Sequence, residues 1–219
     1  MSSTDIIKAK RVPKQEIKYK ITLTGEQKEA KRIIYDNKVT ALWGVAGTSK
    51  TMCSVHTALD LFFKKEVDKI YILRPAVSME DIGFLKGSAE DKLQYYFIPI
   101  MHNLYQNYDK VKIDKMIENK DIEIVPLGFI QGITISNSIL ICDEAENITE
   151  RQMRMVLTRL GKGSKIVFTG DIDQIMLKDV KSSGFKKLID LEGYLNGFAS
   201  FELKQNYRDE FVQEILKLY

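Results

Sequence analysis

Residues 44–51 read GVAGTSKT. It matches the phosphate-loop pattern G-x-x-x-x-G-K-[ST] except at Ser49, which stands in place of the second glycine. Residues 38–44, KVTALWG, predict a buried strand, and residues 50–65, with apolar residues at helical spacing, predict a helix. A phosphate loop needs this strand–loop–helix setting, because its backbone N–H groups must converge on phosphate oxygens. The stretch therefore predicts a site for a phosphorylated ligand.

The alternation of apolar and amphipathic segments continues along the chain. Further strands are predicted at residues 68–75, 121–126, 138–144, 164–171 and 198–204, and further helices at residues 25–36, 93–105, 150–161, 184–192 and from about residue 209. We expect Thr24 to cap the first of these helices, Pro99 to break or kink the second and Gly161 to end the third. Strands that alternate with helices indicate a three-layer α/β domain with a mostly parallel central sheet.

The composition is that of a soluble globular protein, since 44% of the 219 residues are hydrophobic and 29% are charged. No apolar run approaches the roughly 20 residues that span a bilayer, and the N-terminus lacks the apolar core of a signal peptide. We therefore expect a cytoplasmic protein without a membrane partner. The two cysteines, Cys53 and Cys142, lack the spacing of a metal site or a disulfide framework and are expected to be buried thiols.

Two segments are candidates for contact with nucleic acid. Basic residues concentrate in residues 8–20, KAKRVPKQEIKYK, although the net charge of the chain is only +3. This tract either binds phosphate backbones or is a solvated tail, and we predict that residues 1–20 form a flexible basic segment before a single domain at residues 21–219. The aromatic residues Tyr95, Tyr96 and Phe97 either stack on bases or pack in the core, and their size favours the core.

Two adjacent carboxylates end the predicted strand SILICDE at residues 138–144. A parallel strand delivers its terminal side chains to the crevice at its carboxyl end, where ligands bind in open α/β sheets. Asp143 is thereby a candidate partner of Mg²⁺ beside the threonine of the phosphate loop, and Glu144 is a candidate general base that polarises water. The alternative is a solvated strand end, which is common, but the phosphate loop upstream favours the functional interpretation.

Two later segments add polar groups near the ends of predicted strands. VFTGDIDQ, residues 167–174, ends in Gln174, whose amide suits a γ-phosphate or the attacking water, although Gly-Asp pairs also form simple turns. FELKQNYRDE, residues 201–210, is predicted to place Arg208 directly after a strand, where a guanidinium neutralises charge on phosphate. An arginine that opens a surface helix is more often only solvated, so this assignment depends on the other motifs.

These segments occur in the order of the ATP-site motifs of superfamily-one helicases, and the chain resembles the N-terminal RecA-like domain of those enzymes. TGEQKEA, residues 24–30, resembles their adenine-reading glutamine motif. The closer resemblance is to the PhoH-like family of ATPases, through RPAVSMEDIGFLKG at 74–87, VPLGFIQG at 125–132 and CDEAENITERQMRMVLTRLGKGSKIVFTGDIDQ at 142–174. It extends from about residue 22 to the C-terminus. The compact size and the departures from the pattern indicate a bacteriophage version, whose location would be the host cytoplasm.

The resemblance implies a RecA-like domain that hydrolyses ATP with Mg²⁺ and acts on single-stranded nucleic acid, with RNA favoured over DNA. It implies that ATP is bound by Gln27, which reads adenine, and by Gly44, Val45, Ala46, Gly47, Thr48, Ser49, Lys50 and Thr51. The implied catalytic and metal roles are a phosphate bridge at Lys50, metal ligation at Thr51 and Asp143, a general base at Glu144, a γ-phosphate sensor at Gln174 and charge stabilisation at Arg208. No role follows for Arg74 or Arg159.

Two departures from the helicase pattern leave a second function open. Superfamily-one helicases close the ATP site with a second RecA-like domain, whereas this chain ends at Tyr219. We therefore expect a neighbouring subunit to supply that wall in a homo-oligomer, for which a hexameric ring is one form. Ser49 stands at a position where a left-handed backbone costs a residue other than glycine on the order of 1–3 kcal/mol. The alternative to a motor is an ATP-binding scaffold with little or no hydrolysis.

Overall fold

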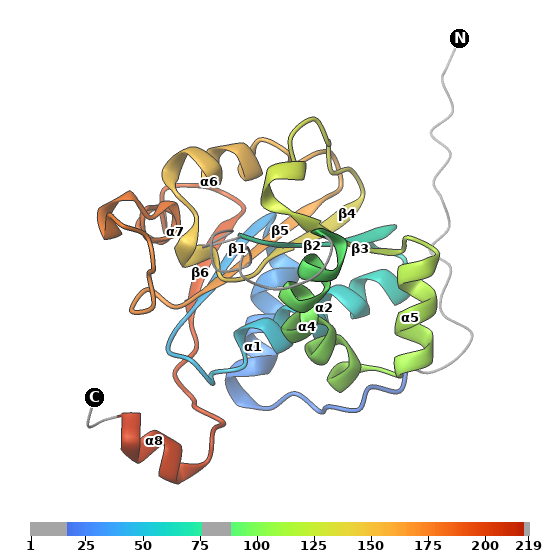
Figure 1. The fold of residues 1–219 in the computed structure, drawn as a ribbon, viewed down its shortest axis with the longest axis horizontal. Coiled ribbons are helices and arrows are strands. Elements are labelled where there is room, and N and C mark those ends of the chain that lie inside the picture. The colour runs from blue at the N-terminus through green and yellow to red at the C-terminus, as the bar shows by residue number, and fades with distance from the viewer. Residues whose placement is uncertain (1–16, 76–88, 217–219) are drawn as a thin grey trace.

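The computed structural model describes residues 17–75 and 89–216, without the side chains of residues 89–96 and 216 (Figure 1). Its α-helices are α1 (Gly25–Asp36), α2 (Lys50–Phe63), α4 (Ala89–Asn107), α5 (Lys110–Glu118), α6 (Glu150–Leu157), α7 (Gly184–Ile189) and α8 (Glu210–Leu216). Its strands are β1 (Val39–Trp43), β2 (Lys69–Arg74), β3 (Ile122–Pro126), β4 (Ser138–Cys142), β5 (Lys165–Gly170) and β6 (Phe198–Glu202). Short 3₁₀ helices lie at η1 (Leu127–Phe129), η2 (Ala145–Asn147) and η3 (Val180–Ser182).

The described strands form one sheet in the order β3-β2-β4-β5-β1-β6, and every pairing between them is parallel. Because β1, β5 and β4 are neighbours, the segments that follow them emerge at the same edge of the sheet. The phosphate loop follows β1, the adjacent carboxylates follow β4, and the Gly-Asp pair follows β5. The predicted α/β sheet is confirmed. Its strand order brings together the phosphate loop, the Asp143–Glu144 pair and the Gly-Asp pair at residues 170–171.

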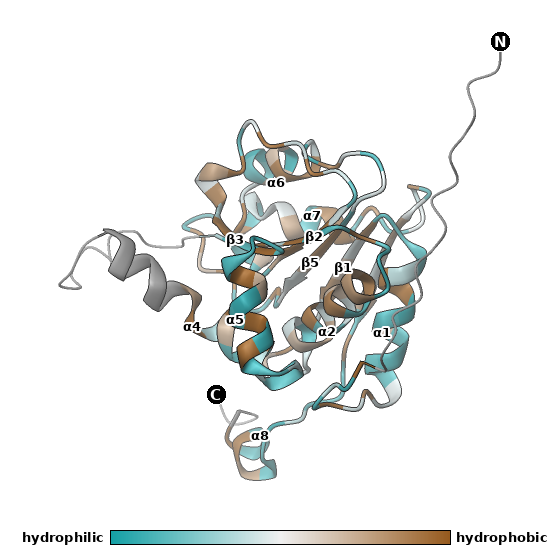
Figure 2. Ribbon diagram, turned by 90° about the vertical axis from the view of Figure 1, so that its right-hand side faces the viewer, coloured by the Kyte–Doolittle hydropathy of each residue, from teal (hydrophilic) through white to brown (hydrophobic). Residues whose placement is uncertain are grey.

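Helices cover both faces of the sheet, which gives the three predicted layers (Figure 2). Alternation along β4 illustrates the division, since Ile139 and Ile141 pack against the layer of α1, α2, α4 and α5, whereas Leu140 and Cys142 pack against α6 and α7. All four of these β4 side chains are fully buried. A strand buried on both faces is expected in a parallel sheet, and it is apolar throughout for that reason.

Two predicted element boundaries are wrong, and the predicted break at Pro99 does not occur. The helix α4 continues through Pro99 as one element, because burial of Ile100 and Leu104 against α2 outweighs the backbone hydrogen bond that proline cannot donate. A kink at Pro99 stays a prediction. The helix α6 ends at Leu157 rather than at Gly161, whose backbone N–H instead donates to Ile135 O at 2.7 Å. The strand β6 ends at Glu202, so Arg208 lies in the following loop rather than directly after the strand.

Other sequence predictions have mixed outcomes. Cys53 and Cys142 are buried free thiols, as expected. Phe97 is half-buried against the core, which favours packing over base stacking at that position. The side chains of Tyr95 and Tyr96 and the basic residues 8–16 lie outside what the structure describes. Within the described part of the chain, no helix has both the length and the apolar character needed to cross a lipid bilayer.

Gly44 ends β1 in a conformation that only glycine tolerates. Its φ is 139°, and a Cβ added there would lie 2.2 Å from the backbone O of Leu203. Since both are main-chain constraints, we expect Gly44→Ala to lower the free energy of unfolding by about 2–4 kcal/mol. Urea denaturation checks this, with Gly128→Ala as the control, because a Cβ at Gly128 meets no atom within 4 Å. Equal stability of the two variants would contradict the close approach of Gly44 to the strand-end loop.

Candidate nucleotide-binding site

The loop between β1 and α2 has the backbone shape of a phosphate loop. Gly47 has a φ of 93°, and Ser49, which precedes α2 as its N-cap, has φ 67° and ψ 21° in the left-handed region. The helix therefore begins directly at Lys50, so the unpaired N–H groups of its first turn and the positive end of its dipole face the loop. This arrangement has the backbone geometry that favours an anion, and serine occupies a glycine conformation in it.

The left-handed conformation of Ser49 leads to a stability prediction. We expect Ser49→Gly to change the free energy of unfolding by less than about 1 kcal/mol, since released strain and added chain entropy oppose each other. Ser49→Val is expected to lower it by about 2 kcal/mol or more, because a β-branched residue is a true outlier at positive φ. Chemical denaturation of both variants measures the difference. A valine variant as stable as the glycine variant would show that position 49 is not left-handed in solution.

Lys50 is held over the loop by main-chain acceptors. Its Nζ donates to Gly44 O at 2.6 Å and to Val45 O at 2.9 Å. Burial lowers the pKa of Lys50, while Asp171 and the acids that follow β4 oppose that shift. Thr48 stabilises the same turn from within, because its Oγ1 donates to Val45 O at 2.9 Å. The ammonium group therefore lies at the centre of the loop, where an anion would compete with the backbone carbonyls for it.

Thr51 and Asp143 meet although they are far apart in the chain. Thr51 Oγ1 donates to Asp143 Oδ1 at 2.7 Å, and Thr169 Oγ1 of β5 donates to the same oxygen at 2.7 Å. Burial raises the pKa of Asp143, and the two hydroxyl hydrogen bonds lower it. The structure thus brings together the two residues predicted to hold a metal, and Thr169, which the sequence reasoning did not select, orients the carboxylate.

Glu144 is also in the left-handed region, with φ 55°. Its Oε1 lies 3.1 Å from Arg74 Nη2, at the end of β2. Arg74 had no role in the sequence analysis, and the structure shows that it pairs with the predicted base. An arginine in this position fixes the direction of the carboxylate through a charge-assisted hydrogen bond.

Glu146 is a buried acid beside the site that the sequence analysis missed. It is 1% exposed, and its Oε2 accepts from the Asp171 backbone N–H at 3.2 Å. Asn147 Nδ2 donates to its Oε1 at 2.9 Å. Burial, followed by a hydrogen bond to Glu144, raises the pKa of Glu146 far above its usual range. The carboxyl group is therefore protonated at neutral pH and links the segment after β4 to the segment after β5.

This protonated carboxyl predicts a pH dependence of stability. The folded state keeps the proton of Glu146 while the unfolded state releases it above about pH 4.5. Stability from this residue is therefore complete at low pH and is lost as pH rises toward the folded-state pKa. We expect the free energy of unfolding to fall by about 1 kcal/mol per pH unit between about pH 6 and pH 9. Urea titrations of Glu146→Gln should lack this slope, and an unchanged slope would contradict the assignment.

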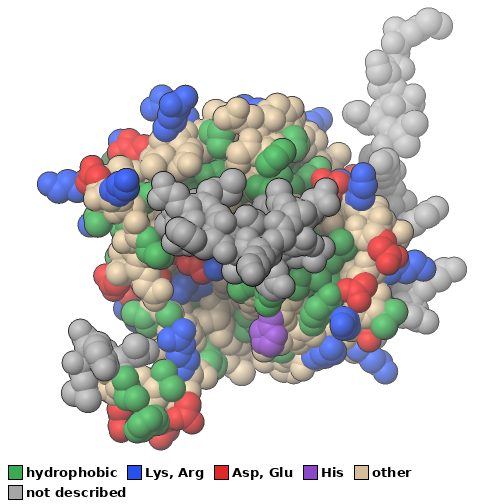
Figure 3. All heavy atoms as spheres, in the orientation of Figure 1, with side chains coloured by type: hydrophobic (Ala, Val, Ile, Leu, Met, Phe, Trp, Pro, Cys, Tyr) green, Lys and Arg blue, Asp and Glu red, His purple; other side chains and the backbone are tan. Residues whose placement is uncertain are grey.

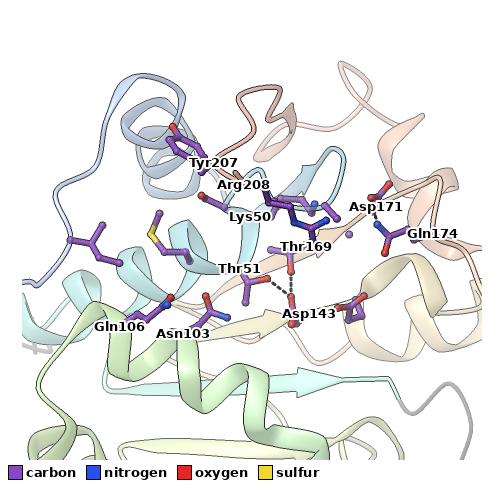
Figure 4. A pocket seen from close by; sticks show the side chains of 17 residues that line it. Lys50, Thr51, Asn103, Gln106, Asp143, Thr169, Asp171, Gln174, Tyr207 and Arg208 are labelled. Carbon is purple, nitrogen blue, oxygen red and sulfur yellow. Dashed lines mark hydrogen bonds between the residues drawn. The ribbon is translucent and has the colours of Figure 1, made fainter. Parts of the chain in front are cut away.

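Residues of the two later segments, 167–174 and 201–210, line the same region. Gln174 Nε2 donates to Asp171 Oδ2 at 2.7 Å, which holds the amide at the cavity wall. In the loop after β6, the Tyr207 backbone N–H donates to Gly47 O at 3.0 Å and Asn206 Nδ2 donates to the neighbouring Ala46 O at 3.2 Å. This loop therefore clamps the phosphate loop from one side and places Arg208 over the cavity (Figure 4).

These groups surround one open cavity of about 650 Å³. Predicted residues at its wall are Ala46, Gly47, Ser49, Lys50, Thr51, Asp143, Glu144, Gln174 and Arg208. Wall residues that the sequence analysis did not assign are Ile21, Met52, Asn103, Gln106, Thr169, Gly170, Asp171 and Tyr207. Figure 4 shows Tyr207, Asn103 and Gln106 on one side of Lys50 and Thr51, with Asp171 and Gln174 on the other.

Four residues predicted to bind ATP do not line this cavity: Gln27, Gly44, Val45 and Thr48. Gln27 is buried at the start of α1, where its Oε1 accepts from the Thr24 backbone N–H at 3.1 Å. That contact is part of a capping box, so this glutamine has a structural task in the described molecule. Its role toward adenine stays a prediction.

A glycine-containing loop between a strand and a helix, with the helix threonine bonded to an aspartate on a nearby parallel strand, defines the class of P-loop NTPase domains. Within that class the family is also clear. The sequence profile described as "PhoH-like protein" matches residues 20–219, and the chain belongs to this family. No comparison tests the predicted bacteriophage origin, which stays a prediction.

The curated relatives that the chain resembles carry the name of the same family. The chain is 36% identical over 201 residues to a PhoH-like protein of Synechocystis sp., which covers 90% of this chain and 61% of that protein. It is 36% identical over 179 residues to a PhoH-like protein of Bacillus subtilis, which covers 80% of this chain and 56% of that protein. It is 32% identical over 196 residues to protein PhoH of Escherichia coli, which covers 87% of this chain and 54% of that protein. The chain therefore spans 54–61% of the lengths of these relatives.

Solved structures with similar coordinates are distant in sequence. The Pif1 helicase from Candida albicans has a TM-score of 0.48 at 16% identity, and the match covers 90% of this chain and 43% of that one. The SWI2/SNF2 ATPase core of Sulfolobus solfataricus, solved in complex with dsDNA, has a TM-score of 0.47 at 13% identity. That match covers 87% of this chain and 46% of the other.

Proposed function

We propose that this chain binds ATP with Mg²⁺ and hydrolyses it, and that hydrolysis is coupled to movement on, or remodelling of, single-stranded RNA or DNA. One observation carries the ATPase proposal. Thr51 at the start of α2 is hydrogen-bonded to Asp143 at the end of β4, beside the ammonium of Lys50 and the carboxylate of Glu144. Hydrolysis of a phosphoanhydride needs two ligands or partners for the metal ion, a cation for the phosphates and a base for the attacking water in one place.

The residues present fit a magnesium ion. Mg²⁺ prefers oxygen ligands and is usually held by one or two protein groups together with phosphate oxygens and water. A threonine hydroxyl and an aspartate oxygen 2.7 Å apart at the cavity wall are such a pair. No group of three or more His, Cys, Asp or Glu side chains is placed to hold a metal among residues 17–75 and 97–215, which agrees with a site that phosphate must complete. Bound there, the ion would neutralise charge that develops on the phosphate oxygens.

The remaining polar groups have distinct tasks in this proposal. Lys50 leaves the carbonyls of the loop and contacts the β- and γ-phosphates. Glu144, directed by Arg74, accepts a proton from the attacking water. Gln174, held by Asp171, meets the γ-phosphate. These tasks follow from where each group lies at the cavity wall.

The base of the nucleotide is proposed to lie on the side of Tyr207, away from the carboxylates. Tyr207 is 41% exposed, and the apolar side chains of Ile21 and Met52 line the same cavity. An aromatic ring and aliphatic neighbours suit the flat apolar faces of a purine. Gln27 would have to leave its capping contact to reach that base. Arg208 is placed to neutralise phosphate charge, in its own subunit or in a neighbour.

Coupling to nucleic acid, assembly into a homo-oligomer and a cytoplasmic location extend the proposal. Coupling to nucleic acid is supported by the resemblance of the site segments to the ATP-site motifs of superfamily-one helicases. The cavity is open to solvent and Arg208 lies at its wall, which supports closure by a second subunit. An ATP-binding scaffold without turnover is the second candidate, and the left-handed Ser49 is the observation that favours it.

Phosphate release from ATP tests the coupling. The rate is measured with Mg²⁺ in the presence of single-stranded RNA, single-stranded DNA of the same sequence, or neither. The motor proposal predicts acceleration of at least about tenfold by one of the two strands, since a coupled enzyme completes its site only on its track. Equal rates in all three conditions would contradict coupling. ATP binding without release in any condition would support the scaffold.

A further inference from the structure

The helix α8 exposes an apolar face that nothing in the described chain covers. Phe211 is 67% exposed, and Val212 and Ile215 are 38% and 37% exposed. α8 lies apart from the sheet and its covering helices in both ribbon views (Figures 1 and 2). Figure 3 shows apolar and acidic side chains gathered on it at the lower left. An isolated helix of this length is unstable in water, so a surface of this kind calls for a covering partner.

The acidic residues of α8 flank this apolar face. Glu210 and Glu214 are exposed and four positions apart, so they share one side of the helix next to Phe211 and Ile215. Neither glutamate forms an ion pair with another described residue. The helix therefore offers an apolar ridge with two unpaired negative charges along one flank.

A groove lies beside α6 and η1, at the opposite end of the molecule from α8. Its charged side chains are basic, whereas those of α8 are acidic. The groove has a volume of about 860 Å³, and its lining includes Pro126, Leu127, Phe129, Met155, Arg151 and Arg154. Phe129 is 71% exposed. Arg151 and Arg154 lie one turn apart and form no ion pair in the described chain, and none of the described residues that line the groove is acidic. The groove is therefore an apolar trough with two unpaired positive charges.

The two surfaces are complementary in shape, polarity and charge. A convex apolar ridge fits a concave apolar trough, which is the helix-in-groove mode of recognition. The spacing of the glutamates on α8 matches that of the arginines on α6, since residues three and four apart on a helix are neighbours. Because α6 and α8 lie at opposite ends in both ribbon views, one molecule does not join its own two surfaces.

We propose that α8 of one copy of this chain docks in the α6 groove of a second copy. The contact is heterologous, because the two partners use different surfaces, and such contacts repeat from subunit to subunit, giving a ring where the rotation closes and a filament where it does not. This inference rests on the homo-oligomer of the proposed function and names its interface. It requires neither ATP hydrolysis nor nucleic acid. Phe211 is the anchor in the trough, and Glu210 and Glu214 pair with Arg151 and Arg154.

A charge swap tests this contact in the whole chain. One variant carries Arg151→Glu and Arg154→Glu, and a second carries Glu210→Arg and Glu214→Arg. Mass is measured by size-exclusion chromatography with light scattering, in Mg²⁺ with and without ATP. We expect wild-type protein to have the mass of several subunits and each variant alone to have the mass of one. An equimolar mixture of the two variants should regain the wild-type mass, because each reversed surface then meets its complement.

The matched control carries Glu66→Arg and Glu118→Arg, two exposed acids elsewhere on the surface, and should keep the wild-type mass. A monomeric wild type, or reversed variants that associate like wild type, would overturn the proposal. Loss of binding to labelled single-stranded RNA by the groove variant, with its mass unchanged, would overturn it in favour of a nucleic-acid groove. A wild type that associates through this contact but releases no phosphate would contradict the ATPase and leave the contact standing.

Discussion

Glu144→Gln is expected to slow phosphate release from ATP by about 10²–10⁴-fold while ATP binding is kept. Glutamine has the shape of glutamate and cannot accept a proton from water, so the loss falls on the chemical step. Arg74, 3.1 Å from the carboxylate, keeps its position but no longer faces a charge. Steady-state phosphate release gives the rate, and the change in fluorescence of a labelled ATP analogue gives the affinity.

Glu150→Gln is the matched control for this substitution. Glu150 is an exposed acid at the start of α6, paired with Lys187 at 2.7 Å and absent from the cavity wall. A surface pair of this kind contributes little, so turnover should stay within about twofold of wild type. If Glu144→Gln also released phosphate at the wild-type rate, the base would have to be another residue, and the assignment of Glu144 would be wrong.

Lys50→Ala is expected to weaken ATP binding and to lower turnover by about 10²–10³-fold. The ammonium is the cation that the phosphate loop presents, and alanine leaves the phosphate charge to backbone N–H groups alone. Both affinity and rate should fall, in contrast to Glu144→Gln, where the rate alone falls. The same two assays measure the difference, and far-ultraviolet circular dichroism confirms that the variant is folded.

Lys181→Ala controls for the loss of one positive charge. Lys181 is exposed in η3 and does not line the cavity. It should bind and hydrolyse ATP like wild type. A Lys50→Ala variant that is folded and binds the ATP analogue with wild-type affinity would contradict the placement of phosphate against the loop.

Local patterns were sufficient to predict the three-layer α/β fold and the centre of the site. The strand, loop and helix around GVAGTSKT are contiguous, so their geometry follows from neighbouring residues. Asp143 and Glu144 end an apolar run whose position at a strand terminus is equally local. That Thr51 and Asp143 touch depends on β1, β5 and β4 being adjacent. The strand-end position of Asp143 predicted that it lies near Thr51, but not the direct hydrogen bond between them.

What the sequence did not predict depends on contacts between distant residues. The pairing of Arg74 with Glu144 joins the ends of two strands, and no local pattern marks it. Glu146 looks like an ordinary surface acid, and only burial beside Asp171 gives it a proton at neutral pH. The early end of α6 results from the backbone contact between Gly161 and Ile135, which competes with the helix.

Phosphate release from ATP by the wild-type chain, with Mg²⁺ and then with an excess of EDTA, shows whether this cavity hydrolyses ATP. The arrangement of Lys50, Thr51, Asp143 and Glu144 predicts linear release with Mg²⁺, none with EDTA, and release with Mg²⁺ that Glu144→Gln slows by about 10²–10⁴-fold. Release that is independent of Mg²⁺ and of Glu144, or tight ATP binding with no release at all, would contradict the proposal that this cavity hydrolyses ATP.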